Sequence, residues 1–378
     1  MAAPLTPVVR SDGTAPIPLV DLAAQHAEAT AEQAAGWAEV LARTAFVGGP
    51  AVAEFEAAYA AYSGVEHVVG VANGTDALEL ALRALGVGPG DECLVPANTF
   101  IATAEAVVRA GAEVVLVDCE PGTALIDVDA ALAAVTDRTR AVLPVHLYGQ
   151  VADVARLEAG LPDHVAICED AAQSQGARRD GLQAGAIGDI AGTSFYPGKN
   201  LGAYGDAGAV LTNSAELAER VRLLGAHGSP RKYEHTVAGV NSRLDALQAV
   251  VLSAKLTRLD AWNAARRAAA ARYDALLADL PGVTTPTVTA GNEPVWHLYV
   301  IEVDRRDEVL AHLNAHGVGA GIHYPTPVHL TGAFGHLGKT GDFPVAEAAA
   351  ERILSLPLYP QITEEQQQRV VDVLRTAL

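Results

Sequence analysis

The sequence has few cysteines, few aromatic residues and no long apolar run. Its three cysteines, Cys93, Cys119 and Cys168, lie far apart without CxxC spacing, which argues against a disulfide framework and a zinc site. We therefore expect buried free thiols, no metal and a reducing cytoplasm. No apolar run reaches the roughly 18 residues of a membrane span, and prolines interrupt the N-terminus where a signal peptide needs an apolar core. We expect a cytoplasmic protein without membrane association.

Basic residues are also scarce. The chain has 26 lysines and arginines against 45 acidic residues, which gives a formal net charge of -19. No run of basic side chains could neutralise the phosphates of a nucleic acid, so we expect no nucleic-acid partner. Half of the 378 residues are apolar, which allows a sizeable core. The length fits one large and one smaller domain, at about 150 residues per domain.

Short apolar runs alternate with helical stretches in the first two thirds of the chain. The pattern predicts strands at 67–73, 92–97, 113–118, 141–149, 164–170 and 190–195, with helices at 75–86, 99–111 and from residue 127. Continuous apolar strands separated by helices indicate a parallel sheet that is covered on both faces.

The last third of the chain predicts a second, smaller unit. Residues 242–280 form one long helical pattern that would join two domains, and strand, helix and strand patterns follow at 295–303, 306–318 and 319–325. We expect an α/β protein with a flexible N-terminal extension at 1–15, a large parallel-sheet domain at 16–250, and a linking helix with a small C-terminal α/β domain at 251–378.

A single lysine stands in a glycine-rich stretch, "SFYPGKNLGAYGDAG" at 194–208. Taken alone, Lys199 reads as a solvated side chain on a flexible turn. The alternative is that its amine forms a Schiff base with a carbonyl, as catalytic lysines do. Motifs elsewhere in the chain are needed to choose between these two interpretations.

Polar residues follow the predicted strands, where ligands of parallel α/β sheets gather. Asn73-Gly74-Thr75-Asp76 joins a strand to a helix start, and the free N–H groups there suit a phosphate, although a plain helix cap by Thr75 or Asp76 fits as well. Asp170 ends a buried strand. A carboxylate there needs a cation or a protonated ring nitrogen as partner, unless it too caps a helix.

Two further strand ends add a hydroxyl and an aromatic ring. Ser194 precedes Lys199 by five residues, and Phe100 follows the strand at 92–97, where it would stack on a flat ring or pack in the core. Together the candidates supply a phosphate cradle, a stacking ring, an acid for a pyridine nitrogen and a lysine for an aldehyde. This combination is that of a pyridoxal 5'-phosphate site.

The chain resembles the DegT/DnrJ/StrS family of PLP-dependent nucleotide-sugar aminotransferases, which have the fold-type I, aspartate aminotransferase-like architecture. The resemblance covers nearly the whole chain through the motifs "IPLVDL" (17–22), "GTDALELALRALGVGPGDE" (74–92), "EDAAQ" (169–173), "SFYPGKNLGAYGDAGA" (194–209), "GVNSRLDALQA" (239–249) and "SLPLYP" (355–360).

The resemblance implies a role for each matching residue. Lys199 would form the Schiff base, Asp170 would pair with the pyridine nitrogen, Gln173 would meet the ring hydroxyl and Phe100 would stack on the ring. The phosphate would be held by Gly74, Thr75 and Ser194, with Asn241 from the neighbouring subunit. The sequence departs from the family at Ser174-Gln175, where many relatives have Ala-His before the glycine.

The resemblance also implies the reaction, an amino transfer from L-glutamate to a keto group of a nucleotide-diphosphate keto-6-deoxyhexose in amino-deoxysugar biosynthesis. Residues 232–263 and 146–150 look more like members that aminate C3 of thymidine-diphosphate sugars, with C4 as the alternative. A regulatory protein without transaminase activity is a further alternative. We expect a homodimer with shared active sites, in which Arg231 and Tyr324, like Asn241, lie in the partner subunit's site. Arg231, Lys232 and Tyr324 are the candidate substrate contacts.

Overall fold

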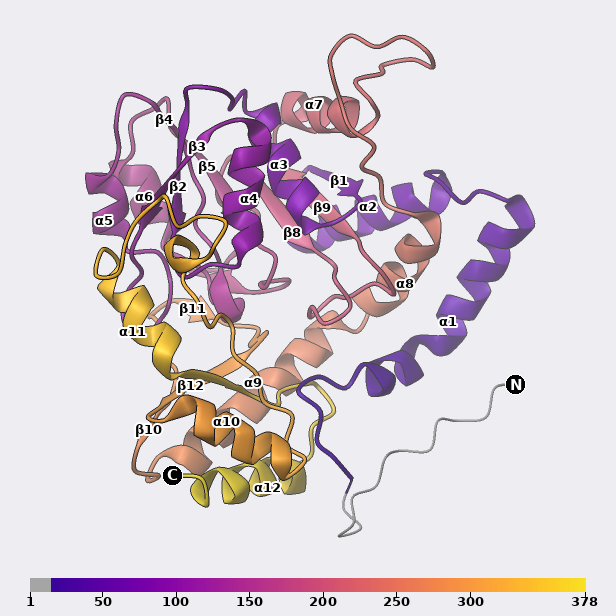
Figure 1. Ribbon diagram of the computed structural model, residues 1–378. Coiled ribbons are helices and arrows are strands. Elements are labelled where there is room, and N and C mark those ends of the chain that lie inside the picture. Colours follow the sequence, from indigo (N-terminus) through magenta and orange to yellow (C-terminus); the bar gives the residue numbers. More distant parts are fainter. Residues whose placement is uncertain (1–14) are drawn as a thin grey trace.

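A computed structural model describes residues 15–378, so the predicted extension at 1–15 lies almost entirely outside the described residues. The chain forms a large unit around a seven-stranded sheet and a smaller unit around a three-stranded sheet (Figure 1). No described helix combines the length and apolarity that a membrane span requires. The predicted division into domains, with boundaries at residues 15 and 250, stays a prediction.

The large sheet has the strand order β1-β9-β8-β5-β4-β2-β3. Its strands are β1 (His67–Val71), β2 (Glu92–Pro96), β3 (Glu113–Val117), β4 (Thr139–Val142), β5 (Ala166–Asp170), β8 (Ile190–Ser194) and β9 (Gly208–Thr212). The prediction of a parallel sheet is wrong at β9, which runs antiparallel to both β1 and β8. A parallel return needs a crossover, usually a helix, but the glycine-rich loop after β8 contains no helix and brings the chain straight back.

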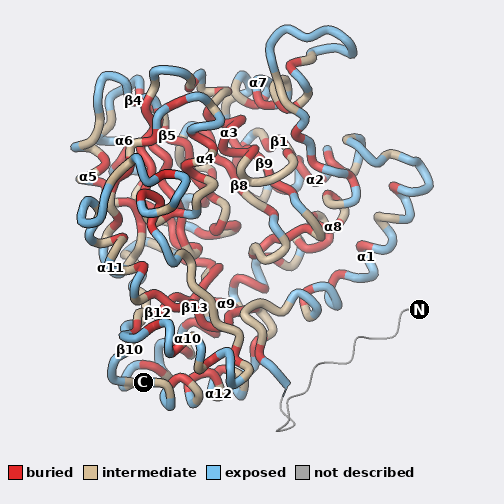
Figure 2. Tube along the Cα trace, viewed as in Figure 1, coloured by how far each residue is buried: buried red, intermediate tan, exposed pale blue. Residues whose placement is uncertain are grey.

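Helices cover both faces of this sheet, as the strand pattern predicts. One face packs against α3 (Gly74–Ala84), α4 (Ile101–Ala110) and α7 (Ala215–Gly225). The other face packs against α2 (Pro50–Ser63), α5 (Val128–Ala133), α6 (Val154–Gly160) and α8 (Ala246–Leu256). The sheet and α3 are buried, whereas the surrounding loops are exposed (Figure 2). All three cysteines are free and buried, which confirms the expectation for the thiols.

The smaller unit packs helices on an antiparallel sheet. The sheet is formed by β10 (Val283–Thr284), β12 (Tyr299–Val303) and β13 (Ile353–Leu356), and the helices are α9 (Leu259–Leu277), α10 (Arg306–Ala315) and α12 (Glu364–Arg375). The strand predicted at 319–325 is wrong, because only Gly321 makes an isolated bridge, to Ser355. Two glycines and a proline weaken strand formation in this segment, and β13 takes the place beside β12.

The predicted helix at 242–280 is two helices, α8 and α9, which are separated at Thr257 and Arg258. In Figure 1, α8 lies against the large unit and α9 continues into the smaller one. The long helix α1 (Leu22–Arg43) also contacts α8. The remaining elements are the short sheet of β6 (Arg178–Arg179), β7 (Leu182–Gln183) and β11 (Asn292–Glu293), helix α11 (Pro344–Arg352), and two 3-10 helices, η1 (Leu147–Gly149) and η2 (Val328–Leu330).

Candidate active site

A cavity of about 670 Å³ opens at the carboxyl ends of β1, β5 and β8. It brings together eight of the predicted residues, which come from distant parts of the sequence: Gly74, Thr75, Phe100, Asp170, Gln173, Ser194, Lys199 and Tyr324. A second, more apolar cavity of about 350 Å³ lies beside it and shares only Leu147, Leu298 and Tyr324 with the first. The predicted chemistry therefore belongs to the first cavity.

The start of helix α3 forms an anion cradle. Asn73 caps this helix, because its side chain accepts a hydrogen bond from the Asp76 N–H at 2.8 Å; a cap by Thr75 or Asp76 is wrong. The N–H groups of Gly74 and Thr75 make no hydrogen bond to another described residue, as expected in the first turn of a helix. Free N–H groups at the positive end of the helix dipole suit a phosphate.

Gly74 lets the helix start approach strand β8 closely. A Cβ on Gly74 would stand 2.6 Å from Cβ and 3.2 Å from Oγ of Ser194, which is too close for any side chain. The Ser194 Oγ accepts from the Tyr196 N–H at 3.2 Å, so its hydroxyl hydrogen remains able to donate into the cradle. The residues of this cradle fit a phosphate group.

Asp170 ends β5 with its carboxylate at the cavity wall. Its Oδ2 accepts a hydrogen bond from Thr103 Oγ1 at 2.7 Å, and its Oδ1 accepts from the Ala172 N–H at 3.1 Å. No helix begins after Asp170, because residues 171–177 form turns, so the helix-cap reading is wrong. A carboxylate accepts up to about four hydrogen bonds, which leaves capacity for a protonated ring nitrogen.

Lys199 lines the same cavity and is half-buried there. Burial lowers the pKa of its amine to about 8, although the negative charge of Asp170 acts in the opposite direction. A lysine with an ordinary pKa near 10.4 is almost wholly protonated at neutral pH, whereas Lys199 has an accessible neutral form. The geometry favours the nucleophile over a solvated turn residue.

Gln173, Phe100 and Tyr324 also line the cavity. Tyr324 lies in the same chain as Lys199, so the expectation that it enters the partner subunit's site is wrong. Gln173 Nε2 donates to the Tyr324 hydroxyl at 3.0 Å, and Gln173 Oε1 accepts from the Tyr148 N–H at 2.6 Å. Phe100 is 49% exposed as a residue, and the centroid of its ring lies 5.1 Å from that of Tyr324. Phe100 is therefore not a core residue, and its exposed ring can stack on a ligand.

Two histidines of the cavity wall were missed by the sequence analysis. His323 Nδ1 pairs with Ser355 Oγ at 2.8 Å, and burial together with Lys199 lowers the pKa of His323 to about 4. His297 Nδ1 pairs with Asn200 Oδ1 at 3.2 Å, and burial followed by the charge of Lys199 holds its pKa well below the usual value. Both imidazoles belong to the smaller unit, and no local sequence signal placed them beside Lys199.

Three predicted residues do not line this cavity in the single chain. Asn241 is exposed and forms an isolated bridge with Ala226, while Arg231 and Lys232 are exposed on the loop that follows α7. Figure 1 shows this loop extending beyond α7, away from the sheet. Their predicted roles depend on a second subunit and stay predictions.

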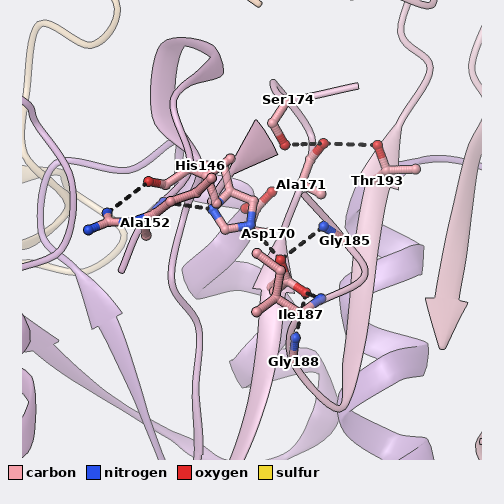
Figure 3. Close-up of polar contacts among 12 residues, drawn as sticks. His146, Ala152, Asp170, Ala171, Ser174, Gly185, Ile187, Gly188 and Thr193 are labelled. Carbon is pink, nitrogen blue, oxygen red and sulfur yellow. Dashed lines mark hydrogen bonds and ion pairs between the residues drawn. The ribbon is translucent and has the colours of Figure 1, made fainter. Parts of the chain in front are cut away.

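Ser174 and Gln175, where the sequence departs from the family pattern, hydrogen-bond to the residues around the end of β8. Gln175 is 2% exposed, and its Nε2 lies 2.9 Å from both Thr193 Oγ1 and the Ser194 carbonyl oxygen. Ser174 and Thr193 both donate to the Ala171 carbonyl (Figure 3). Gln175 does not line the cavity, so its contact with Ser194 is made through the backbone carbonyl outside the cavity.

Comparisons with known proteins identify relatives over almost the full length. Residues 27–375 match the DegT/DnrJ/EryC1/StrS aminotransferase family. The chain is 47% identical over 361 residues to dTDP-3-amino-3,4,6-trideoxy-alpha-D-glucose transaminase of Streptomyces venezuelae, with 95% of each chain covered. It is 46% identical over 360 residues to the pleiotropic regulatory protein of Geobacillus stearothermophilus, with 94% of this chain and 97% of the relative covered.

Solved structures show the same similarity. The crystal structure of S. venezuelae DesV in complex with a ketimine intermediate has a TM-score of 0.94 and 47% identity, and the match covers 96% of this chain and 98% of that one. NtdA of Bacillus subtilis with bound cofactor PMP has a TM-score of 0.84 and 33% identity, and the match covers 92% and 82%.

Proposed function

The chain belongs to the DegT/DnrJ/EryC1/StrS aminotransferase family, and from this premise we propose that it transfers an amino group from L-glutamate to C3 of a nucleotide-diphosphate keto-6-deoxyhexose. It is a PLP-dependent aminotransferase of fold-type I architecture. The observation that carries the proposal is the joint placement of Lys199, Asp170 and the α3 cradle around one cavity.

The residues of the cavity fit pyridoxal phosphate in three places. The N–H groups of Gly74 and Thr75 and the Ser194 hydroxyl would bind the phosphate, Asp170 would hold the ring nitrogen protonated, and Lys199 would carry the cofactor covalently through Nζ. When bound, the cofactor supplies an electron sink and the carbonyl that receives the amino group.

Lys199 has a second task as the proton carrier. Once the donor amine has displaced it, Lys199 Nζ would accept the proton from the donor α-carbon and would deliver it to the former carbonyl carbon of the cofactor. A general base works best with a pKa near the operating pH, and burial brings the pKa of Lys199 to about 8. The side chain of Gln173 is held by hydrogen bonds with Tyr148 and Tyr324, and it would orient the cofactor by contacting the hydroxyl of the pyridine ring.

The preference for C3 of a thymidine-diphosphate sugar is supported by the relative from S. venezuelae, which is named for a 3-amino sugar. We propose a homodimer in which Asn241 of one subunit reaches the phosphate in the other, and in which Arg231 and Lys232 meet the substrate diphosphate. Their exposure on one loop supports this assignment, as does the cationic character that a diphosphate requires. We propose a cytoplasmic location, because all three cysteines are free thiols, as in proteins of a reducing compartment.

The proposal is tested by supplying the purified protein with PLP, L-glutamate and either the 3-keto or the 4-keto thymidine-diphosphate 6-deoxyhexose, and by locating the new amine by NMR. We expect amination at C3, and none with the Lys199→Ala variant as control. Amination at C4 alone would overturn the ring position. Rapid turnover of free keto acids without amination of any nucleotide sugar would overturn the substrate class.

A regulatory role is the second candidate, because one relative is named as a pleiotropic regulatory protein. A protein that only senses a ligand has no need of a half-buried lysine with a lowered pKa beside a carboxylate. The same NMR experiment separates the two roles, since a purely regulatory protein would release no aminated sugar under any of the conditions.

A further inference from the structure

Strand β5 ends in two adjacent carboxylates that serve different faces of the sheet. Successive side chains of a strand point to opposite faces, so Asp170 faces the cavity while Glu169 points away from it. Glu169 is fully buried and accepts four hydrogen bonds. The donors are the N–H groups of Gly185, Ile187 and Gly188 and Nε2 of His146, at 2.9, 2.8, 2.7 and 2.7 Å.

The partner of Glu169 is a neutral imidazole. His146 is fully buried, and its Nδ1 lies 3.1 Å from the Ala152 backbone nitrogen. A backbone N–H can only donate, so Nδ1 accepts and the ring proton resides on Nε2, from which it is donated to Glu169. Figure 3 shows His146 between Ala152 on one side and the loop of Gly185, Ile187 and Gly188 on the other.

Four converging donors hold Glu169 as a carboxylate. Burial alone would raise its pKa, but the hydrogen bonds from His146 and from the backbone N–H groups of Gly188 and Gly185 lower the pKa of Glu169 below its usual value. A buried charge is costly, and a well-packed apolar side chain is often no less stable at such a position. The carboxylate instead fixes a geometry. All four donors reach it only when the loop at 185–188 and the segment of His146 hold one arrangement relative to β5.

These contacts run directly to the backbone of Asp170. The backbone N–H of His146 donates to the Asp170 carbonyl at 3.1 Å, and the backbone N–H of Asp170 donates to the Pro144 carbonyl at 2.9 Å. The segment that carries His146 also carries Tyr148, whose N–H fixes Gln173. The His146–Glu169 pair therefore ties the loop at 185–188 and the segment after β4 to the strand end that presents Asp170.

We propose that His146 and Glu169 are a positioning pair, which sets where the Asp170 carboxylate and Gln173 stand toward the cofactor ring without touching it. This inference rests on the proposed function, since it needs Asp170 to meet the ring nitrogen. A displacement of about 1 Å at a reacting group can lower a rate by about 100-fold. Loss of the pair should thus lower the half-reaction rate and the affinity for the cofactor by more than the accompanying loss of protein stability explains.

Two amide substitutions separate the two hydrogen bonds of His146. His146→Asn keeps an acceptor near the position of Nδ1 for the Ala152 N–H but does not reach Glu169. His146→Gln places an amide donor near the position of Nε2, toward Glu169. The matched control is His329→Asn, because His329 is also buried and pairs with a carboxylate, Glu347, at 3.0 Å, away from the cavity.

Each variant is measured for its melting temperature, its dissociation constant for PLP, the absorbance spectrum of the bound cofactor and the rate of the glutamate half-reaction. We expect His146→Asn to slow the half-reaction about 10- to 100-fold, to weaken PLP binding and to alter the cofactor band. His146→Gln should recover most of these losses, and His329→Asn should lower only the melting temperature.

The inference is overturned if His146→Asn has the PLP affinity, spectrum and rate of the unaltered protein, or changes them no more than His329→Asn does at an equal loss of melting temperature. Asp170→Asn is measured in parallel. If Asp170→Asn is fully active, the assignment of the site fails, whereas a defective Asp170→Asn beside an unaffected His146→Asn refutes the positioning pair alone.

Discussion

Replacing Gly74 with alanine tests the phosphate cradle at its tightest contact. The added Cβ would lie 2.6 Å from the Cβ of Ser194, whereas ordinary van der Waals contact begins at 3.4 Å. The helix start or the end of β8 must therefore move by about 0.8 Å. Both segments carry groups that we assign to the phosphate, so the displacement widens the cradle itself.

The expected loss is larger for cofactor binding than for folding. Overpacking costs roughly 1–3 kcal/mol, and alanine returns up to about 1 kcal/mol of helix propensity relative to glycine, so we expect a net destabilisation of about 0–3 kcal/mol. Cofactor affinity depends on charge-assisted hydrogen bonds that are sensitive to distance. We expect the dissociation constant for PLP to rise about 10- to 100-fold, which corresponds to roughly 1.4–2.8 kcal/mol.

The assay is a PLP titration followed by absorbance, with thermal unfolding of the cofactor-free protein measured in parallel. Gly88→Ala is the matched control, because a Cβ on Gly88 meets no atom within 4 Å, and it should bind PLP normally. A Gly74→Ala variant with the PLP affinity of the unaltered protein would refute the cradle.

Three further predictions concern other parts of the site. Asp170→Asn should keep the fold but lower the half-reaction rate by roughly two orders of magnitude, corresponding to about 2.7 kcal/mol; unchanged turnover would remove its role toward the ring nitrogen. Lys255 is buried on α8, donates to the Gly202 carbonyl at 2.7 Å, and has its pKa lowered by burial to about 8. The unfolded chain binds this proton more tightly than the folded one. The burial of the charge therefore destabilises the fold by its full amount below pH 8, and this destabilisation decreases between pH 8 and about pH 10.4. Thermal unfolding should thus show the unaltered protein gaining stability relative to Lys255→Met between pH 7 and 9.5, and a gap independent of pH would contradict this. Mixing inactive Lys199→Ala with inactive Asn241→Ala should restore part of the activity by subunit exchange, and no recovery would mean that each chain is self-sufficient.

The parts of the site that lie next to strands could be predicted from the sequence. Asp170, Ser194 and Gly74 each stand directly at the boundary of an apolar run, and the carboxyl ends of neighbouring parallel strands meet at one edge of a sheet. Strand β9 is not among the predicted strands, and its direction could not be predicted either, because an apolar run carries no information on which way the chain travels. Only the connection after β8, too irregular for a helix, contains that information.

His297 and His323 could not be predicted because their position depends on how the smaller unit packs on the larger one. The hydrogen-bond partners of their rings are Asn200 and Ser355, which lie about a hundred and about thirty residues away in the sequence. The break between α8 and α9 has no glycine or proline to signal it, so the helical pattern continues across Thr257 and Arg258 although the helix does not.

Reduction of the PLP-loaded protein with borohydride, followed by peptide mass mapping, tests the central claim most directly. The reduction fixes the cofactor to whichever amine carries it. The cavity geometry and the lowered pKa of Lys199 predict a single adduct on Lys199 and loss of the cofactor band near the visible region. An adduct on Lys255 or any other lysine, or no adduct with PLP in excess, would contradict the account.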